Sequence, residues 1–499
     1  MRHPLLALLA CASLAAQEAP QGWTPEAMLQ VKRLESPRPS PDGQWVAFTV
    51  RSALLGPEQS EFRTQIHVAA TSGASRRALT VADKSSLDPK WSPDGKCLAF
   101  RSPRSGRMQV YALRMDGGEA EAITNGKGEV TAFAWSPDGK RLAYTMVDGR
   151  TEDEEKRDKA KDDARWFEEQ PKLARLYLVD LAADASGNRA PRLLTPEARH
   201  VQSFDWSPDG TTLAYAHVRS PKVDHWPTAD LALVNVGNGQ ERVLAATPAA
   251  ESSPKFSRDG KTLAFTLSDP KPRWAGSHRL AVLDVASGAV RALPPTPDGQ
   301  AQLLGWSGDG RHLLFQEATA VKGGLYSMKV EDGSLLRLDA GAWTVAGGAM
   351  VGAGEFVDLD PTGRYLGLVV QTASEPPTLA FSPISQFSPK VIARPNGELP
   401  RNPLPRTEVV RWKGAKGLEI EGLLTHPLNG KPGVKAPLIV LPHGGPTQMY
   451  GETYVASPSQ YPLAALAARG FALLRPNIRG SSGYGRDFRF ANEADWGGL

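Results

Sequence analysis

A short turn signature repeats along most of the chain, and it constrains the fold more than any other feature. In its full form it reads aromatic-Ser-Pro-Asp-Gly, with an apolar strand pattern shortly after it. Proline presets φ at the second turn position, aspartate bonds back to the backbone, and glycine adopts the left-handed conformation, so each copy predicts a hairpin turn. Seven copies, mostly about 50 residues apart, occupy 40–43, 91–95, 135–139, 206–210, 256–260, 306–310 and 360–363.

The segments between the turns contain further strand patterns, such as 109–113 and 279–284. About four strands per repeat of this length is typical of one blade of a β-propeller. The seven copies predict an all-β, seven-bladed β-propeller over residues 36–395, preceded by a helical segment at 22–35. The aromatic residues of the signature are expected to pack between neighbouring blades.

The N-terminus has the features of a secretory signal peptide. A short basic start is followed by an apolar run from Leu5 to Leu14 and by the small residues Ala15 and Ala16, which predicts a signal peptide over residues 1–16. The protein is then exported to the periplasm or secreted. Alternatively, residues 8–11 resemble a lipobox, in which Cys11 would be lipidated. No other run is apolar and long enough to predict a transmembrane helix.

Composition excludes several classes of function. The formal net charge is +4 and no basic block is present, so nucleic acid is not an expected partner. Cys97 is the only cysteine outside the predicted signal peptide, so no intramolecular disulfide is expected. The histidines lack metal-ligand spacing, and no glycine-rich phosphate loop follows a strand, so neither a metal nor another cofactor is predicted.

One interval between turns is about 20 residues longer than the others. It contains a mixed-charge run over 151–163, which predicts a solvated loop or a frayed helix. The run is followed by an aromatic pair and two carboxylates, at Trp166, Phe167, Glu168 and Glu169. Exposed aromatic side chains beside two acids make this insertion a candidate binding element.

The pattern changes after about residue 400 from repeated strands to alternating strands and helix. Strands are predicted at 408–412, 418–424, 437–441 and 471–475, with a helix over 461–469 that ends at Gly470. Two glycine-rich loops follow strands of this region, one containing His443-Gly444-Gly445 and the other spanning 477–485. This order predicts the N-terminal part of an α/β domain over residues 400–499.

These loops carry a resemblance to a known family. His-Gly-Gly-Pro after a strand, the run Arg-Pro-Asn-Ile-Arg-Gly-Ser-Ser-Gly-Tyr-Gly at 475–485, and Asp-Trp-Gly-Gly at 495–498 resemble the prolyl oligopeptidase family of serine peptidases. The bacterial acylaminoacyl peptidases and dipeptidyl aminopeptidases are the most similar types. The resemblance implies an incomplete α/β-hydrolase peptidase domain at 400–499, short peptide substrates, and a propeller that gates access to the active site.

The resemblance also assigns roles to individual residues. Gly444 and Gly445 match the loop whose backbone N–H groups supply the first oxyanion donor of α/β-hydrolases. His443 matches the leading histidine of that motif and is not the triad base. In dipeptidyl peptidases of the family a glutamate pair on a propeller insertion binds the amino terminus of the substrate, which would be the role of Glu168 and Glu169.

The family's nucleophile motif, Gly-x-Ser-x-Gly, does not occur in the sequence. The serine, acid and base of the family would follow Gly498, so the chain as given is expected to be inactive. We also expect residues 400–499 to be poorly stable in isolation, because strands that would cover the sheet edge are missing.

Two other interpretations remain open. One is a non-enzymatic periplasmic propeller similar to the Tol-system propeller protein, which binds partners with similar repeats. The other is a natural pseudoenzyme. The segment from Leu441 to Tyr484 argues against a binding propeller, which has no need of the oxyanion loop of a hydrolase.

Overall fold

The computed structural model describes residues 22–497, except 163, 165, 167, 170, 196–197, 274–275, 347–355, 432 and 446. The predicted signal peptide and Cys11 lie outside the described residues. Within the described ranges no helix is both long and apolar enough to cross a membrane, and no group of three or more His, Cys, Asp or Glu residues is arranged to hold a metal ion.

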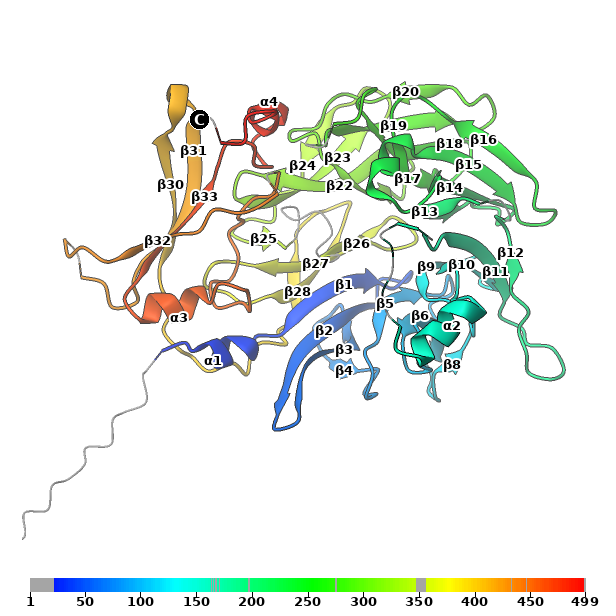
Figure 1. Ribbon diagram of the computed structural model, residues 1–499, viewed down its shortest axis with the longest axis horizontal. Coiled ribbons are helices and arrows are strands. Elements are labelled where there is room, and N and C mark those ends of the chain that lie inside the picture. Colours follow the sequence, from blue (N-terminus) through cyan, green and yellow to red (C-terminus); the bar gives the residue numbers. More distant parts are fainter. Residues whose placement is uncertain are drawn as a thin grey trace, which may run out of the picture.

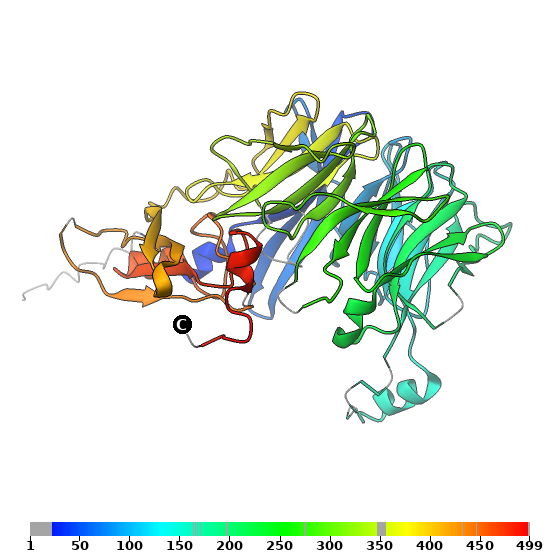
Figure 2. The same cartoon turned by 90° about the horizontal axis from the view of Figure 1, so that it is seen from above.

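Seven antiparallel sheets between Arg33 and Ala393 form a ring of blades, which confirms the predicted all-β propeller (Figures 1 and 2). The first three blades are β1 (Arg33–Pro39), β2 (Trp45–Gly56), β3 (Gln59–Ala70), β4 (Arg76–Ala78); β5 (Leu87–Trp91), β6 (Cys97–Ser102), β7 (Gln109–Arg114), β8 (Glu121–Ala122); and β9 (Val130–Trp135), β10 (Arg141–Val147), β11 (Ala174–Asp180), β12 (Arg192–Leu193). Blades four and five are β13 (His200–Trp206), β14 (Thr212–Val218), β15 (Asp230–Asn235), β16 (Glu241–Ala245); and β17 (Glu251–Phe256), β18 (Thr262–Ser268), β19 (His278–Asp284), β20 (Val290–Ala292). Blades six and seven are β21 (Gln302–Trp306), β22 (His312–Thr319), β23 (Lys322–Lys329), β24 (Leu335–Arg337); and β25 (Thr344–Val345), β26 (Val357–Leu359), β27 (Tyr365–Gln371), β28 (Thr378–Pro383), β29 (Lys390–Ala393).

The turn signature lies between the first two strands of a blade and is closed by its own side chains. In blade 1 the Ser40 hydroxyl donates to Asp42 Oδ1 (2.5 Å), and Gly43 N donates to Ser40 O (2.9 Å). Gly43 has φ +70°, which L side chains rarely adopt. These local bonds explain why the sequence pattern predicts the blades.

The tryptophans of the signature lie between blades, as predicted, and their indole N–H groups add a bond across the joints that they occupy. Trp91 Nε1 donates to Arg38 O (2.8 Å), Trp135 Nε1 to Lys90 O (3.0 Å), and Trp306 Nε1 to Lys255 O (2.9 Å). Each acceptor belongs to the first strand of the preceding blade. The side chain therefore both fills the joint and fixes its register.

The turn prolines pack in a similar way, but the series is broken between blades 5 and 6. In the first four joints the proline of one blade covers the turn glycine of the next, as Pro208 covers Gly260. Arg258 replaces the proline in blade 5, and no atom lies within 4 Å of a Cβ built on Gly310 of blade 6. A groove of about 470 Å³ opens at this joint, lined in part by Arg258 and Trp306.

Between residue 22, where the described part begins, and the propeller lies one short helix, α1 (Pro25–Leu29), capped by the Thr24 hydroxyl. The segment predicted as helical at 22–35 is thus helical only in part. Strand β1 begins at Arg33 because residues 33–35 pair with 49–51 of β2. The insertion in blade 3 contains α2 (Glu152–Lys159), which has a Thr151–Glu154 capping box and projects from the propeller (Figure 2).

The C-terminal part is a mixed sheet in the order β30 (Thr407–Lys413), β31 (Glu419–Thr425), β33 (Ala472–Asn477), β32 (Leu438–Val440). Strands β32 and β33 are parallel and are joined through α3 (Leu463–Ala468), and α4 (Arg486–Phe490) follows β33. Short 3-10 turns occur at η1 (Val223–Thr228) and η2 (Ala415–Gly417). Helix α3 packs beside α1, so the chain that enters the propeller also contacts this C-terminal part.

Candidate active site

The glycine-rich loop that follows β32 faces open space. Gly444 is exposed, and a Cβ built on it would meet no atom within 4 Å. Gly445 has φ +129°, and a Cβ there would lie 3.0 Å from Gln448 and Thr447. The loop therefore needs glycine at 445 for its backbone and leaves room for a ligand at 444. The predicted role of the two N–H groups as oxyanion donors stays a prediction.

His443 anchors the start of this loop. Its Nδ1 lies 2.9 Å from Gly444 O and its Nε2 lies 2.8 Å from Ser481 Oγ. Because a carbonyl oxygen only accepts, Nδ1 donates to Gly444 O. The Ser481 hydroxyl, which lies against Nε2, donates to Ile478 O at 2.6 Å. Burial lowers the pKa of His443, which keeps the ring neutral. Both ring nitrogens thus contact groups of the two glycine-rich loops. That His443 is not a catalytic base stays a prediction.

The second glycine-rich loop, 478–485, supports the end of the first. The Ser482 hydroxyl contacts Thr447 O, and Ser482 N donates to Gln448 O (3.2 Å). At Gly480, with φ +99°, a Cβ would lie 2.2 Å from the Asn492 side chain. The close approach of Asn492 therefore requires glycine at this position.

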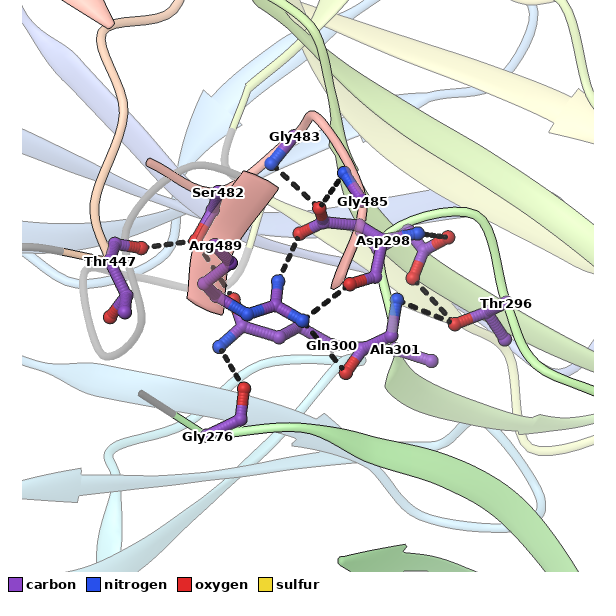
Figure 3. Close-up of polar contacts among 12 residues, drawn as sticks. Gly276, Thr296, Asp298, Gln300, Ala301, Thr447, Ser482, Gly483, Gly485 and Arg489 are labelled. Atoms are coloured by element: carbon purple, nitrogen blue, oxygen red, sulfur yellow. Dashed lines mark hydrogen bonds and ion pairs between the residues drawn. The ribbon is translucent and has the colours of Figure 1, made fainter. Parts of the chain in front are cut away.

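A turn of the propeller, residues 296–300, lies directly against this second loop (Figure 3). Sequence reasoning missed it. The available signal was the sequence Thr-Pro-Asp-Gly at 296–299. It resembles the turn signature but precedes β21, the first strand of blade 6, whereas the signature follows the first strand of a blade. Its Asp298 is 1% exposed and pairs with Arg489, which is fully buried.

A buried carboxyl lies behind that turn. Glu317 of β22 accepts from the Thr296 hydroxyl (2.8 Å) and from Asp298 N (3.1 Å). Burial raises the pKa of Glu317 to about 7, and the nearby Asp298 carboxylate acts in the same direction.

The structure does not bring Glu168 and Glu169 together with the loop at 443–445. They lie on the insertion of blade 3, and both views show α2 well apart from β32 (Figures 1 and 2). Glu168 Oε2 lies 3.1 Å from Lys222 Nζ, in an ion pair with the neighbouring blade. Trp166 is 82% exposed beside them.

A cavity of about 560 Å³ lies on the propeller axis at the turn-signature face. The residue before the turn in successive blades contributes to its wall, and several of these residues are charged: Arg38, Lys90, Asp205, Lys255 and Asp358. Arg38 pairs with Asp358 across the first and last blades (2.5 Å), and Lys255 lies 3.9 Å from Asp205. The wall of the cavity is thus formed by opposite charges that bind one another.

Comparison with known proteins bears on both parts of the chain. Residues 30–172 match the family model described as TolB beta propeller domain. The uncharacterized peptidase YuxL of Bacillus subtilis is 26% identical, over 95% of this chain and 73% of its own length. Dipeptidyl-peptidase 5 of Porphyromonas gingivalis is 21% identical, over 95% of this chain and 70% of its own.

Solved structures show the same fold. The acylaminoacyl peptidase of Pyrococcus horikoshii superposes with a TM-score of 0.71 at 20% identity, over 94% of this chain and 69% of that one. A puromycin-hydrolysing peptidase of Mycobacterium tuberculosis gives 0.65 at 18% identity, over 94% and 69%. These alignments extend through the propeller into the C-terminal sheet, which a propeller-only binding protein would not match. The relatives and structural neighbours of this chain are thus peptidases of the prolyl oligopeptidase family, of the acylaminoacyl and dipeptidyl types.

Proposed function

We propose that the protein is a serine-type peptidase that releases dipeptides or acylated amino acids from short peptides. The observation that carries the proposal is the loop at 443–445, which is open at Gly444 and anchored at both ends. A solved relative is described in complex with Z-Gly-Gly-Phe-chloromethyl ketone, a peptide-like inhibitor. That description supports peptides as the substrate class.

In the serine-peptidase mechanism proposed here, the described residues supply the oxyanion donors, and the serine, acid and base come from outside these 499 residues. A serine oxygen attacks the peptide carbonyl, and the carbonyl oxygen becomes an oxyanion that accepts from backbone N–H groups at Gly444 and Gly445. The amine leaves with a proton, and water then hydrolyses the acyl-serine. Because the 499 residues contain no Gly-x-Ser-x-Gly elbow, they are expected to hydrolyse peptides only as part of a polypeptide that also supplies the serine, acid and base.

We propose that the propeller limits which substrates reach the site. The ion-paired charges around its axial cavity support this role, since a folded protein would have to separate Arg38 from Asp358 to pass. Short peptides would reach the loop at its open side, at Gly444.

We propose that Glu168 and Glu169 bind the free amino group of the substrate. Two carboxylates on an exposed insertion support this. The ion pair of Glu168 with Lys222 weakens substrate binding, because an incoming ammonium group must compete with Lys222.

Export through the predicted signal peptide at 1–16 is also proposed. Mass spectrometry of the mature N-terminus distinguishes cleavage near Ala16 from lipidation at Cys11.

The test is hydrolysis of Ala-Pro and Gly-Pro dipeptide anilides and of N-acetyl-Ala anilide. Two polypeptides are compared, the 499 residues alone and one that continues through the downstream reading frame to a Gly-x-Ser-x-Gly elbow. Activity of the longer polypeptide alone is the expected result, and the preferred substrate separates the dipeptidyl from the acylaminoacyl type. A folded longer polypeptide that cleaves none of these substrates would contradict the proposal and favour a binding propeller.

A further inference from the structure

The propeller contacts the C-terminal part through a turn that belongs to neither predicted site. This turn, residues 296–300, connects blade 5 to blade 6 and is called the clamp turn below. We propose that Asp298 and Gln300 of the clamp turn are positioning residues for the oxyanion loop (442–448), and that they act through Ser482. The inference rests on the proposed function, in which that loop receives the substrate oxygen.

Asp298 holds the second glycine-rich loop by its backbone. Its Oδ1 accepts from Gly483 N and from Gly485 N, each at 2.9 Å, and its Oδ2 accepts from Arg489 Nη1 at 2.9 Å (Figure 3). The two glycines have φ +95° and +86°, so their N–H groups converge in a conformation that other residues rarely adopt. One buried carboxylate therefore fixes both the loop and the first turn of α4.

Gln300 links the clamp turn to the oxyanion loop by a single side chain. The Ser482 hydroxyl shares its one proton between two acceptors, Gln300 Oε1 at 2.9 Å and Thr447 O. Gln300 itself is oriented by its Nε2, which donates to Gly276 O at 3.1 Å. Since Thr447 lies two residues after Gly445, the position of Ser482 sets where that end of the loop lies.

The clamp turn is itself held in place by several hydrogen bonds within the propeller. Glu317 accepts from Asp298 N and from the Thr296 hydroxyl, and Gly299 N donates to that hydroxyl at 3.2 Å. A second propeller segment contacts the same loop, where Ala320 N donates to Gly483 O at 2.7 Å. The loop at 482–485 thus contacts two propeller segments, the clamp turn and Ala320, which lie before and after the first two strands of blade 6.

Other contacts across the same boundary offer matched controls. Arg486 of α4 pairs with Asp269 (3.0 Å), and Arg273 pairs with Glu493 (2.5 Å). These ion pairs join the same two parts of the chain but do not involve residues 480–485 or 442–448. If the clamp turn only held the propeller and the C-terminal part together, removing one of these ion pairs would loosen the oxyanion loop as much as removing the Gln300 side chain.

The direct test is amide hydrogen–deuterium exchange by mass spectrometry on the 499-residue chain, which does not depend on activity. Q300L and D298N are expected to accelerate exchange at least about 10-fold in peptides covering 443–450 and 480–485, and to leave the strands of blades 1 to 4 unchanged. D269N is expected to change only peptides of α4. Q300L removes two neutral hydrogen bonds, to Ser482 and to Gly276, and no charge, so it is informative even if D298N disturbs the fold. Unchanged exchange at 443–450 in Q300L, or an equal change in D269N, would overturn the inference.

A second readout uses the longer polypeptide of the hydrolysis test. There Q300L is expected to lower kcat about 10-fold with little change in KM, because a displaced oxyanion loop binds the substrate but stabilises its transition state less. D269N is expected to keep both constants. A change of KM alone in Q300L would contradict positioning of the oxyanion loop. If the parent polypeptide shows no hydrolysis, the proposed function fails while the exchange experiment still decides the inference.

Discussion

Asn396 forms hydrogen bonds to both backbone polar groups of Lys32, although the two residues are 364 positions apart. Its Oδ1 accepts from Lys32 N (2.8 Å) and its Nδ2 donates to Lys32 O (3.0 Å), with a further bond to Pro377 O. Lys32 directly precedes β1 and Asn396 follows β29. Blade 1 and blade 7 share no strand, so side chains rather than a common sheet join the two ends of the propeller.

We therefore expect N396A to destabilise the protein by about 2–3 kcal/mol, because it leaves buried backbone groups without partners. Urea unfolding followed by fluorescence measures the change. N238A, in an exposed turn of blade 4, is the control and is expected to stay within about 0.5 kcal/mol of the parent. Equal midpoints for N396A and the parent would show that the ring does not depend on this side chain.

Glu317 makes stability depend on pH. Its pKa in the folded chain is about 7, above the ordinary value of 4.5, because burial disfavours the carboxylate. A carboxyl with a raised pKa stabilises the fold fully below about pH 4.5, and this stabilisation is lost as the pH rises through about 7. The loss is on the order of 3 kcal/mol.

We expect E317Q to weaken the pH dependence of urea unfolding between pH 5 and 8, since Gln keeps an acceptor for Asp298 N without titrating. The pKa of Glu251 is also raised to about 7 by burial, so E251Q removes a second contribution with the same sign. An unchanged slope of stability against pH in the double variant would contradict the assignment.

The two glycines of the oxyanion loop are expected to respond differently to alanine. G444A should fold normally, since a Cβ there meets no neighbour, but should lower kcat/KM of the longer polypeptide on the order of 100-fold by displacing the substrate oxygen from the N–H groups. G445A should lose about 1–3 kcal/mol of stability because φ is +129°. Full activity in a folded G444A would remove Gly444 from the site.

The indole bond between blades is testable with a variant that keeps an aromatic ring in the joint. W306F keeps an aromatic ring at a residue that is 6% exposed but removes the donor to Lys255 O. The expected loss is about 1–2 kcal/mol, since a buried carbonyl is left without its partner. W166F, at an exposed tryptophan, is the control, and an equal effect of the two variants would show that the bond contributes nothing.

Lys222 is expected to restrain the glutamate pair. In the longer polypeptide K222M should lower KM for free-amine dipeptide anilides about 3–10-fold, because Glu168 no longer has a competing partner and a half-exposed ion pair contributes about 1 kcal/mol. The E168Q/E169Q double variant should raise KM for the same substrates. N-acetylated substrates should respond to neither change, and a parallel shift for them would exclude amine recognition by these residues.

The parts of this fold that the sequence predicts are those set by neighbouring residues. Ser40, Asp42 and Gly43 close their turn within four positions. Each blade can therefore be predicted from the sequence of its own repeat. The start of β1 at Arg33 was less predictable, because its partners lie in β2.

The support of the oxyanion loop was not predictable from the sequence. Asp298 reaches Gly483 across 185 positions and Ser482 reaches Gln300 across 182, and no local pattern specifies such a pairing. The ion pair of Glu168 with Lys222 was hidden for the same reason. Motif reasoning predicted residues that would meet a substrate, which stays a prediction, but it did not identify the residues that contact and support their loop.

The missing proline in blade 5 has a mechanical consequence. Four joints of the ring are stiffened by proline against glycine, whereas Arg258 and Gly310 leave the joint between blades 5 and 6 with a groove. The clamp turn emerges from this same joint. It leads into β21, whose far end borders the groove, so a change in the spacing of blades 5 and 6 is expected to move Gln300 and, with it, Ser482.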